Sequence, residues 1–438
     1  MTHNGEPPVS FEGKYSPDVM ASQALGFLDD AASYDDPFFV AVAPIAPHSN
    51  MRLREPRQFE LPEYAERHAG LFKDYKIPRT ENFNPDIPSG VSWVRELPKL
   101  NQTLLDYHDE FQRSRLRALQ SVDEMIDGLV QSLESKGLLD NTYIIYTTDN
   151  GYHISQHRLP PGKECPFEED IHIPLIVRGP GVPAGNKAGI ISSHTDLTPT
   201  ILKLAGIDRP DLDGSPIPLN KESLSSPSSG EHVNVEFWGS AGLEGKYGSP
   251  FPHPAATSNN TYKALRLVGE NYNLLYMVWC TGEREFYDIA RDPSQMHNYF
   301  DPMYVMTQAH YELLGRPFKH VINRLDALLM VTKSCKAEQC RQPWRTLHPK
   351  DDVGKLSQAL ERGFDAFYEA QPRVSFAFCV KGHFVSAEGP QNVNQWSGEG
   401  ETGDRDWSGV AHGAQGPLLP GTARKPSFER VGRWSDWV

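Results

Sequence analysis

The sequence predicts an α/β protein with a second, smaller antiparallel unit, and three observations support this fold class. Two short apolar runs, at 38–43 and 142–147, flank a long segment with helical spacing of apolar residues at 109–136. Strand, helix and strand in this order are typical of right-handed parallel crossovers. From residue 262 onward, three strand-like segments follow one another across short turns, which predicts an antiparallel meander.

Two helices are predicted in the first 140 residues. Residues 16–31 have helical spacing, with Ser16 as the expected N-cap and Pro17 at the first helical position. Residues 109–136 form a longer amphipathic helix, and Gly137 stands where a helix commonly ends. These helices would cover a sheet in the N-terminal half of the chain.

The predicted strands of this half are short and apolar. The runs at 38–43 and 142–147 are unbroken, as expected of strands buried on both faces. Further strands are predicted at 173–178 and 233–238, and a helix at 196–205 lies between them.

The pattern changes after residue 240, so we expect three regions. Residues 1–240 form the α/β domain, and residues 241–385 form a C-terminal subdomain of antiparallel strands and helices. Residues 386–438 are rich in Gly, Ser, Gln and Asp without periodicity, which predicts a largely disordered tail. The subdomain's elements are expected as strands at 262–268, 272–279 and 285–289 and a helix at 309–332.

Composition and charge narrow the class of protein. The net charge is -14, from 57 acidic residues against 43 Lys and Arg, which argues against nucleic acid as a partner. No segment approaches the ~20 apolar residues of a membrane span, and the first residues lack the features of a secretory signal. Of the five cysteines, Cys335 and Cys340 are close enough to form a small disulfide loop. The odd count leaves one thiol free or paired outside the chain.

Asp149 and Asn150 directly follow the run at 142–147. A carboxylate and an amide oxygen are suitable ligands for Ca²⁺ or Mg²⁺. The alternative interpretation is an Asx turn at the end of the strand, with Asn150-Gly151 providing the turn geometry. The two residues alone do not decide between a cation site and a turn.

Basic side chains in nearby loops could bind an anion. Lys163 follows Gly162 and could stabilise negative charge, although most lysines are solvated surface residues. His48 follows the run at 38–43 and could donate a hydrogen bond or act as a general acid, or could bond only to backbone. His153 and His157 have a spacing that binds zinc on a helix, but their loop context favours packing roles.

The order and spacing of these residues resemble the sulfatase family, in particular fungal arylsulfatases and the N-acetylglucosamine-6-sulfatase branch. The resemblance covers about residues 15–380. It implies an alkaline-phosphatase-like fold, with a mixed sheet flanked by helices and a small C-terminal antiparallel subdomain. The matching segments are 38–50, 141–153, 159–163, 167–181, 196–201 and 285–293.

The resemblance also implies roles for single residues. Asp149 and Asn150 look like the second pair of divalent-metal ligands, with Ca²⁺ preferred and Mg²⁺ possible. Lys163 and His48 look like residues that contact the sulfate. Related phosphatases and phosphodiesterases have histidine after this aspartate, so Asn150 favours sulfate esters. The implied substrates are a small sulfate ester or a sulfated sugar, and complete family members are secreted or located in vacuole- or lysosome-like compartments.

Sulfatases of this family use a formylglycine nucleophile made from the cysteine of a Cys-x-Pro-Ser-Arg motif, together with an earlier Asp-Asp metal pair. No cysteine precedes His48 here, and the family's metal pair is not recognised in the residues before it. The segment from Cys280 to Arg284 lacks the proline and serine, and Cys165-Pro166 does not match. The sequence therefore predicts an N-terminally truncated sulfatase that folds poorly and lacks turnover. The alternatives are a non-catalytic sulfatase-like remnant and a phosphodiesterase or phosphonate hydrolase of the same superfamily.

Overall fold

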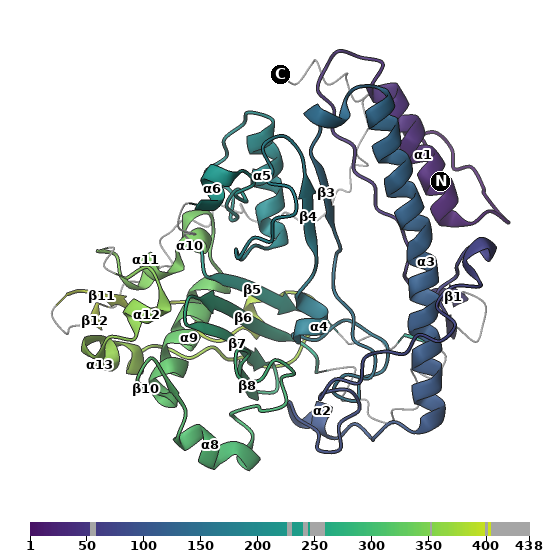
Figure 1. Ribbon diagram of the computed structural model, residues 1–438. Coiled ribbons are helices and arrows are strands. Elements are labelled where there is room, and N and C mark those ends of the chain that lie inside the picture. The colour runs from purple at the N-terminus through teal and green to yellow at the C-terminus, as the bar shows by residue number, and fades with distance from the viewer. Residues whose placement is uncertain are drawn as a thin grey trace, which may run out of the picture.

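The computed structural model describes residues 1–52, 58–225, 230–239, 244–245, 259–350, 353–398 and 402–403. Figure 1 shows two parts: a long helix beside a two-stranded sheet, and a four-stranded sheet surrounded by shorter helices. The connection between the two strands of the small sheet carries Asp149, Asn150 and Lys163, and it packs against the four-stranded sheet.

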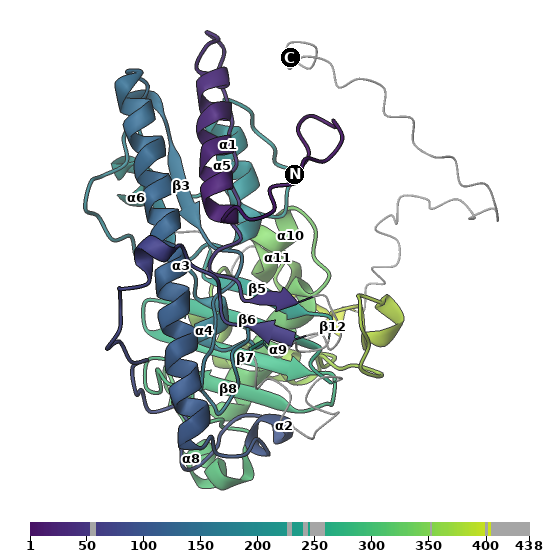
Figure 2. The same ribbon diagram turned by 90° about the vertical axis from the view of Figure 1, so that its right-hand side faces the viewer.

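The helix α1 (Ser16–Ala31) forms where the sequence predicts it. Tyr15 takes the N-cap position, so Ser16 and Pro17 are the first two helical residues instead of the cap and the first position. Proline is tolerated there because the first N–H groups of a helix have no intrahelical partner. Figures 1 and 2 both show α1 running beside the long helix α3 (Gln102–Ser135).

The helix α3 begins earlier than its apolar pattern indicates. The side chain of Asn101 accepts a hydrogen bond from the backbone N–H of Leu104 at 3.0 Å, which caps the first turn. The helix ends before Gly137, whose φ of +68° is the left-handed conformation expected after a C-cap. The cap therefore sets the start of the helix, and glycine sets its end.

The strands β3 (Ile144–Thr147) and β4 (Leu175–Arg178) pair antiparallel, with Ile145 opposite Val177. The parallel crossover predicted between 38–43 and 142–147 is a different connection, and it is not formed because 38–43 has no regular secondary structure. The connection between the strands turns back through α4 (Glu168–Ile171), so the chain returns beside β3 in the opposite direction. Neither strand is fully buried, and Ile176 is 62% exposed.

The expected strand at 38–43 is not formed. These residues have no regular secondary structure, and the side chain of Phe39 is 65% exposed. A strand buried on both faces needs neighbouring strands to satisfy its N–H and C=O groups. The described residues provide no such neighbour for this segment, which is why an apolar run alone does not make a strand here.

The predicted meander is confirmed and extended by one strand. The sheet has the order β5-β6-β7-β8, and every pair is antiparallel. The expected strand at 233–238 is its first strand, so this sheet begins before residue 240. The four strands are β5 (His232–Phe237), β6 (Tyr262–Gly269), β7 (Tyr272–Trp279) and β8 (Arg284–Asp288).

Alternate residues of this sheet form two cores, as the period of a strand requires. On one face, Leu274 and Tyr276 pack with α9 (Phe318–Thr332), which covers that face in Figure 1. On the other face, Leu275 and Met277 pack with residues from the N-terminal half of the chain. The second core joins the two parts of the molecule. Its members from the N-terminal half are Val91, Trp93, Val94, Leu97, Leu159, Cys165 and Phe167.

The predicted helix at 309–332 is interrupted. A short helix α8 (Val305–Ala309) precedes a two-residue hairpin of β9 (Glu312–Leu313) and β10 (Arg316–Pro317), and α9 begins only after it. Leu314 and Gly315 both have positive φ, 51° and 70°, which is the geometry of a tight hairpin turn. The hairpin turn at Leu314 and Gly315 therefore interrupts the helix that the apolar spacing predicts.

The expected disorder from residue 386 is wrong for 386–398. Val393 and Glu388 are buried, and the carboxylate of Glu388 bonds to Lys263 at 2.9 Å and to Lys333 at 3.2 Å. Residues 399–401 and 404–438 lie outside the described residues, so the prediction is not tested there.

Two disulfides stabilise the C-terminal part. The expected bond between Cys335 and Cys340 is formed, and a second bond joins Cys280 to Cys379. Cys165 is the free thiol and is buried. The remaining elements are β1 (Asn50–Arg52), β2 (Gln58–Glu60), α2 (Ser92–Arg95), α5 (Leu197–Leu204), α6 (Lys221–Ser225), α10 (Glu338–Arg341), α11 (Pro343–Leu347), α12 (Leu356–Ala359), α13 (Asp365–Glu369), β11 (Gln395–Trp396) and β12 (Thr402–Gly403).

Candidate functional site

Asp149 and Asn150 follow β3, as predicted. The side chain of Asp149 is exposed, and its Oδ1 accepts the backbone N–H of Asn150 at 3.0 Å. The amide nitrogen of Asn150 donates to the carbonyl of Gly151 at 2.6 Å, which leaves the amide oxygen to act as an acceptor or ligand. The turn-forming interpretation and the ligand interpretation are thus compatible, because the turn uses one carboxylate oxygen and the amide nitrogen.

Gly151 allows the loop after β3 to lie directly against α4. Its N–H donates to the carbonyl of Asp170 at 2.8 Å, and the N–H of Tyr152 donates to Glu169 at 2.7 Å. A Cβ at residue 151 would lie 2.0 Å from the backbone oxygen of Glu169, so no larger residue fits without a shift. This close approach fixes the loop that carries Asp149 and Asn150.

Lys163 and His48 meet at a single carboxylate. Nζ of Lys163 lies 3.1 Å from Oε1 of Glu244, and Nε2 of His48 lies 3.7 Å from the same oxygen. The other oxygen, Oε2, accepts the hydroxyls of Ser49 at 2.7 Å and Tyr152 at 2.8 Å. The structure therefore brings together both basic residues that the sequence predicts for anion binding.

Glu244 is the residue that sequence reasoning missed. It belongs to no periodic element or motif, and no signal in the sequence marks it. Its side chain is 7% exposed. Burial would raise the pKa of this carboxyl, but the hydrogen bond from Ser49 and the charge of Lys163, with a smaller contribution from Tyr152, lower the pKa overall. Glu244 is thus a buried carboxylate that remains ionised at neutral pH.

The loop from 151 to 163 packs against α3. The ring of Tyr152 stacks on Phe111, and the guanidinium of Arg115 lies 3.8 Å from the centre of the same ring. Both α3 residues come from its core-facing side, so the long helix positions the phenol that donates to Glu244. Burial of Tyr152, together with the negative charge of Glu244, raises its pKa well above the usual value.

His153 and His157 are buried, which fits the packing roles expected for them. Nδ1 of His153 lies 2.9 Å from both carboxylate oxygens of Asp170, while the ring of His157 stacks on Phe167 at 4.1 Å. Burial lowers the pKa of His157 to about 3. Burial would lower the pKa of His153, but the charge and hydrogen bond of Asp170, with the charges of Glu164 and Glu169, together raise it.

One group of possible metal ligands occurs among the described residues. Donor atoms of His153, Cys165 and Asp170 lie within 4.8 Å of one another, and all three residues are buried. These groups already satisfy one another, since Asp170 accepts His153 and the backbone N–H of Cys165. Burial raises the pKa of the Cys165 thiol, so the sulfur is protonated and a poor ligand. We therefore interpret these three residues as a hydrogen-bonded group that stabilises the loop after β3, and not as a metal site.

Asp149 and Asn150 fit part of a hard-cation site. Both offer oxygen donors at the molecular surface, and Ca²⁺ takes ~6–8 such ligands. In the described part of the chain, the side-chain hydrogen bonds of these two residues reach only each other and Gly151. These two side chains provide only a fraction of the oxygen ligands that such a cation needs. The loop that carries them continues to Tyr152, whose hydroxyl donates to Glu244.

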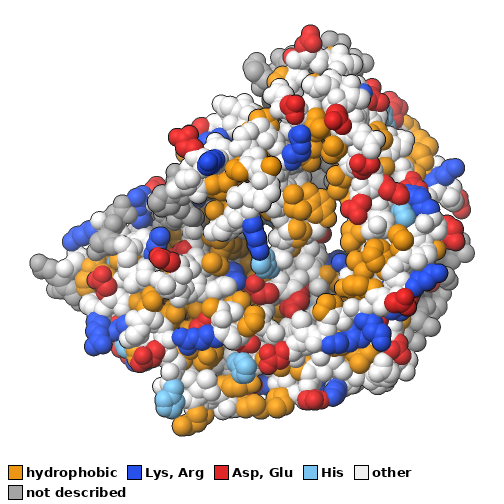
Figure 3. Space-filling model, in the orientation of Figure 1, with side chains coloured by type: hydrophobic (Ala, Val, Ile, Leu, Met, Phe, Trp, Pro, Cys, Tyr) orange, Lys and Arg blue, Asp and Glu red, His pale blue; other side chains and the backbone are white. Residues whose placement is uncertain are grey.

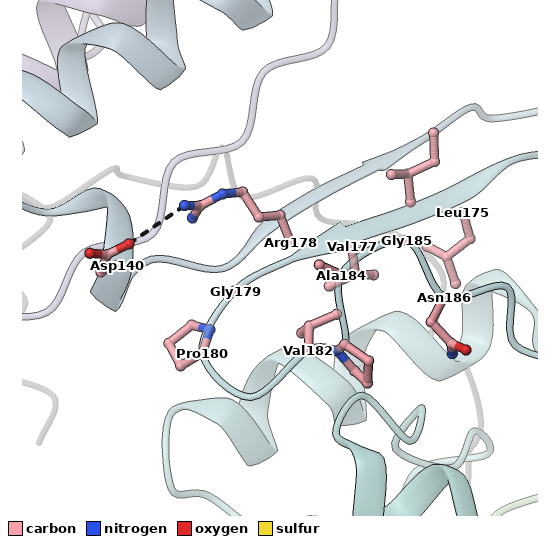
Figure 4. A pocket seen from close by; sticks show the side chains of 12 residues that line it. Asp140, Leu175, Val177, Arg178, Gly179, Pro180, Val182, Ala184, Gly185 and Asn186 are labelled. Atoms are coloured by element: carbon pink, nitrogen blue, oxygen red, sulfur yellow. Dashed lines mark ion pairs between the residues drawn. The ribbon is translucent and has the colours of Figure 1, made fainter.

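A cavity of about 680 Å³ lies elsewhere, beside β4 and the turn that follows it. Figure 4 shows Arg178 and Asp140 forming an ion pair at 3.6 Å at its rim, among small and apolar side chains. No predicted site residue lines it. Figure 3 shows hydrophobic side chains over β4 and along the facing side of α3, consistent with the exposure of Ile176.

Comparison with known proteins places the chain in a family. Residues 2–207 match the profile described as Sulfatase, and residues 162–316 match the C-terminal profile of N-sulphoglucosamine sulphohydrolase. Sulfatase ppz1 of Metarhizium majus is 41% identical over 381 residues, covering 86% of this chain and 80% of that protein. The chain belongs to the sulfatase family. The expected resemblance is thereby confirmed at the level of the family.

This sulfatase has further relatives at lower identity. N-acetylglucosamine-6-sulfatase of Capra hircus is 31% identical over 380 residues, which is 83% of this chain and 60% of that enzyme. The solved structure of BT4656 with its substrate D-glucosamine-2-N,6-O-disulfate superposes with a TM-score of 0.51 and 22% identity, over 68% of this chain and 69% of that one. The structural likeness supports the sulfatase fold with its mixed α/β content. None of the described helices combines the length and apolar character needed to cross a membrane.

Proposed function

We propose that this sulfatase acts on sulfuric esters of the arylsulfatase type and uses His48, Lys163, Asp149 and Asn150. The observation that supports the proposal best is the convergence of Nζ of Lys163 and Nε2 of His48 on one carboxylate oxygen. Two basic groups that face one anionic group of the protein are also placed to face one sulfate. The substrate is a small sulfate ester or a sulfated sugar.

In this proposal, each residue has a defined task. A divalent cation, with Ca²⁺ preferred over Mg²⁺, would be held in part by Asp149 and Asn150, and it would polarise the S–O bonds of the ester. Lys163 has three N–H donors, of which one points to Glu244. The other two can bind sulfate oxygens and balance their charge.

His48 is oriented for proton transfer at one nitrogen. Its Nδ1 lies 2.9 Å from the backbone carbonyl of Ser49, an atom that only accepts, so Nδ1 carries a hydrogen. Nε2 is then the nitrogen that holds the second proton in the imidazolium form. We propose that Nε2 donates this proton to the oxygen of the leaving alcohol. The resemblance implies a formylglycine nucleophile, and we assign none of the residues above to that step.

The proposal is tested by titrating inorganic sulfate into the protein with and without Ca²⁺. Replacement Lys163→Met should weaken sulfate binding about tenfold or more, because charge-assisted hydrogen bonds are lost. Lys187→Met is the matched control, since Lys187 is exposed in the loop between β4 and α5 and should change binding less than about twofold. Equal affinities in the two variants would contradict the assignment of Lys163.

Turnover is measured in parallel with 4-nitrophenyl sulfate and with bis(4-nitrophenyl) phosphate. Ca²⁺-dependent hydrolysis of the sulfate that is lost in Lys163→Met would support catalysis by this site. Hydrolysis of the phosphate diester alone would replace the proposal with a phosphodiesterase or phosphonate hydrolase activity. Sulfate binding without hydrolysis of either compound would favour a non-catalytic, anion-binding sulfatase-like protein.

A further inference from the structure

Glu244 connects the three segments that carry the proposed sulfate-binding residues. Its carboxylate accepts from Ser49, Tyr152 and Lys163, and its backbone N–H donates to the carbonyl of Pro161 at 2.9 Å. One side chain therefore contacts the loop at 48–49, the loop after β3 and the turn that carries Lys163. Nothing else among the described residues is bonded to all three.

The carboxylate is held tightly. Oε2 accepts the hydroxyls of Ser49 and Tyr152, and Oε1 pairs with the ammonium of Lys163 at 3.1 Å, while Nε2 of His48 lies further away at 3.7 Å. Hydrogen bonds that involve a charge are roughly twice as strong as neutral ones, and a buried charge needs them. Three of its roughly four acceptor sites are therefore used by side chains of the protein itself.

We propose that Glu244 is a positioning residue, which fixes the directions of Nζ of Lys163 and Nε2 of His48 toward a shared sulfate. The inference rests on the proposed function, because it concerns the same anion site. Lys163 has a flexible four-carbon stem and an exposed fraction of 23%, so without an anchor its ammonium group would sample many positions. Among the described residues, the ring of His48, 43% exposed, has polar contacts only with the carbonyl of Ser49 and, at 3.7 Å, with Glu244.

The test measures the reactivity of Lys163 toward an amine-acylating reagent, site by site, by mass spectrometry of peptides. Glu244→Gln keeps the size of the side chain but removes its charge. It should raise the acylation rate of Lys163 about tenfold relative to Lys187, which corresponds to about 1.4 kcal/mol of lost ion pairing. Ser49→Ala is the matched control, because it removes a hydrogen bond to the same carboxylate and leaves the Lys163 contact. It should change the rate less than about twofold.

Two internal reporters separate positioning from loss of structure. Lys263 and Lys333 have side chains that are 1% exposed, so they react only if the protein opens. Unchanged reactivity at both, with a rise at Lys163, is the expected result. A rise at all three lysines, or no rise at Lys163 in Glu244→Gln, would overturn the inference.

The same experiment distinguishes failure of this inference from failure of the proposed function. Inorganic sulfate with Ca²⁺ should protect Lys163 from acylation in the natural protein, and protection should be weaker in Glu244→Gln because the ammonium is no longer directed. Absence of protection in the natural protein would count against the sulfate site itself. Protection that is equal in both proteins would leave the sulfate site intact and refute only the role of Glu244.

Discussion

The disulfide between Cys280 and Cys379 should contribute more to stability than the one between Cys335 and Cys340. The first joins residues 99 apart and the second joins residues 5 apart. In the chain-entropy description, a cross-link stabilises by restricting the unfolded chain, and the effect grows with the length of the closed loop. A loop of about 100 residues is worth about 4.7 kcal/mol, and a loop of about six residues is worth about 2 kcal/mol.

The perturbation is a pair of double variants, in which both cysteines of one disulfide become serine. Removing Cys280–Cys379 should lower the free energy of unfolding by about 2.5 kcal/mol more than removing Cys335–Cys340, the matched control. Urea unfolding followed by tryptophan fluorescence measures this difference, since Trp279 is buried in the folded protein. Equal losses, or a larger loss for the short loop, would refute the argument from loop length.

Three other perturbations have defined outcomes. Gly151→Ala should lower the free energy of unfolding in urea by roughly 1–3 kcal/mol, because its Cβ would lie 2.0 Å from a backbone oxygen of α4. The control Gly128→Ala should not lower it, because the nearest atom to that Cβ is 3.9 Å away. Equal losses in the two variants would contradict this. Glu388 is buried, which would raise its pKa, but two buried lysines lower the pKa to about 2, so its contribution is present above pH ~4.5 and is lost as pH falls toward 2. Glu388→Gln should cost about 3–5 kcal/mol at pH 7 and much less near pH 3, and a pH-independent cost would argue against the ion pairs. Burial lowers the pKa of His108 to about 4. The free energy of unfolding should therefore fall by up to about 3 kcal/mol between pH ~6.5 and 4, where the unfolded chain binds a proton that the folded protein does not. The melting temperature of His108→Gln should depend less on pH over that range, and an unchanged pH dependence would contradict the assignment.

Much of the fold follows from local signals in the sequence. The helical spacing and the terminating Gly137 define α3, and alternating apolar residues with short turns define β6, β7 and β8. The disulfide between Cys335 and Cys340 follows from their proximity in sequence. In each case, the interactions that decide the structure lie within a few residues or between consecutive elements.

The errors concern structure that depends on distant partners. The run at 38–43 has the composition of a strand but no neighbouring strand in the described structure, so the crossover predicted from it to 142–147 is not formed. The pairing of Cys280 with Cys379 joins residues that no local pattern connects. The disorder predicted from composition is also wrong at 386–398, where Glu388 forms ion pairs with lysines from distant elements.

The candidate site was predicted in part. The sequence indicated His48 and Lys163 for anion binding, and the structure places both at one carboxylate. Glu244 could not be predicted, because its role comes only from the contacts of a loop residue 81 positions after Lys163 and 196 after His48. Asp149 and Asn150 stay a predicted pair of cation ligands.

We propose that His48, Lys163, Asp149 and Asn150 form one site that binds a divalent cation and a sulfate. A crystal structure of the protein grown with Ca²⁺ and inorganic sulfate, with anomalous diffraction to identify calcium, tests it most directly. We expect calcium on the oxygens of Asp149 and Asn150 and sulfate within hydrogen-bond distance of Nζ of Lys163 and Nε2 of His48. Calcium bound elsewhere, together with Lys163 and His48 facing no sulfate, would contradict the claim.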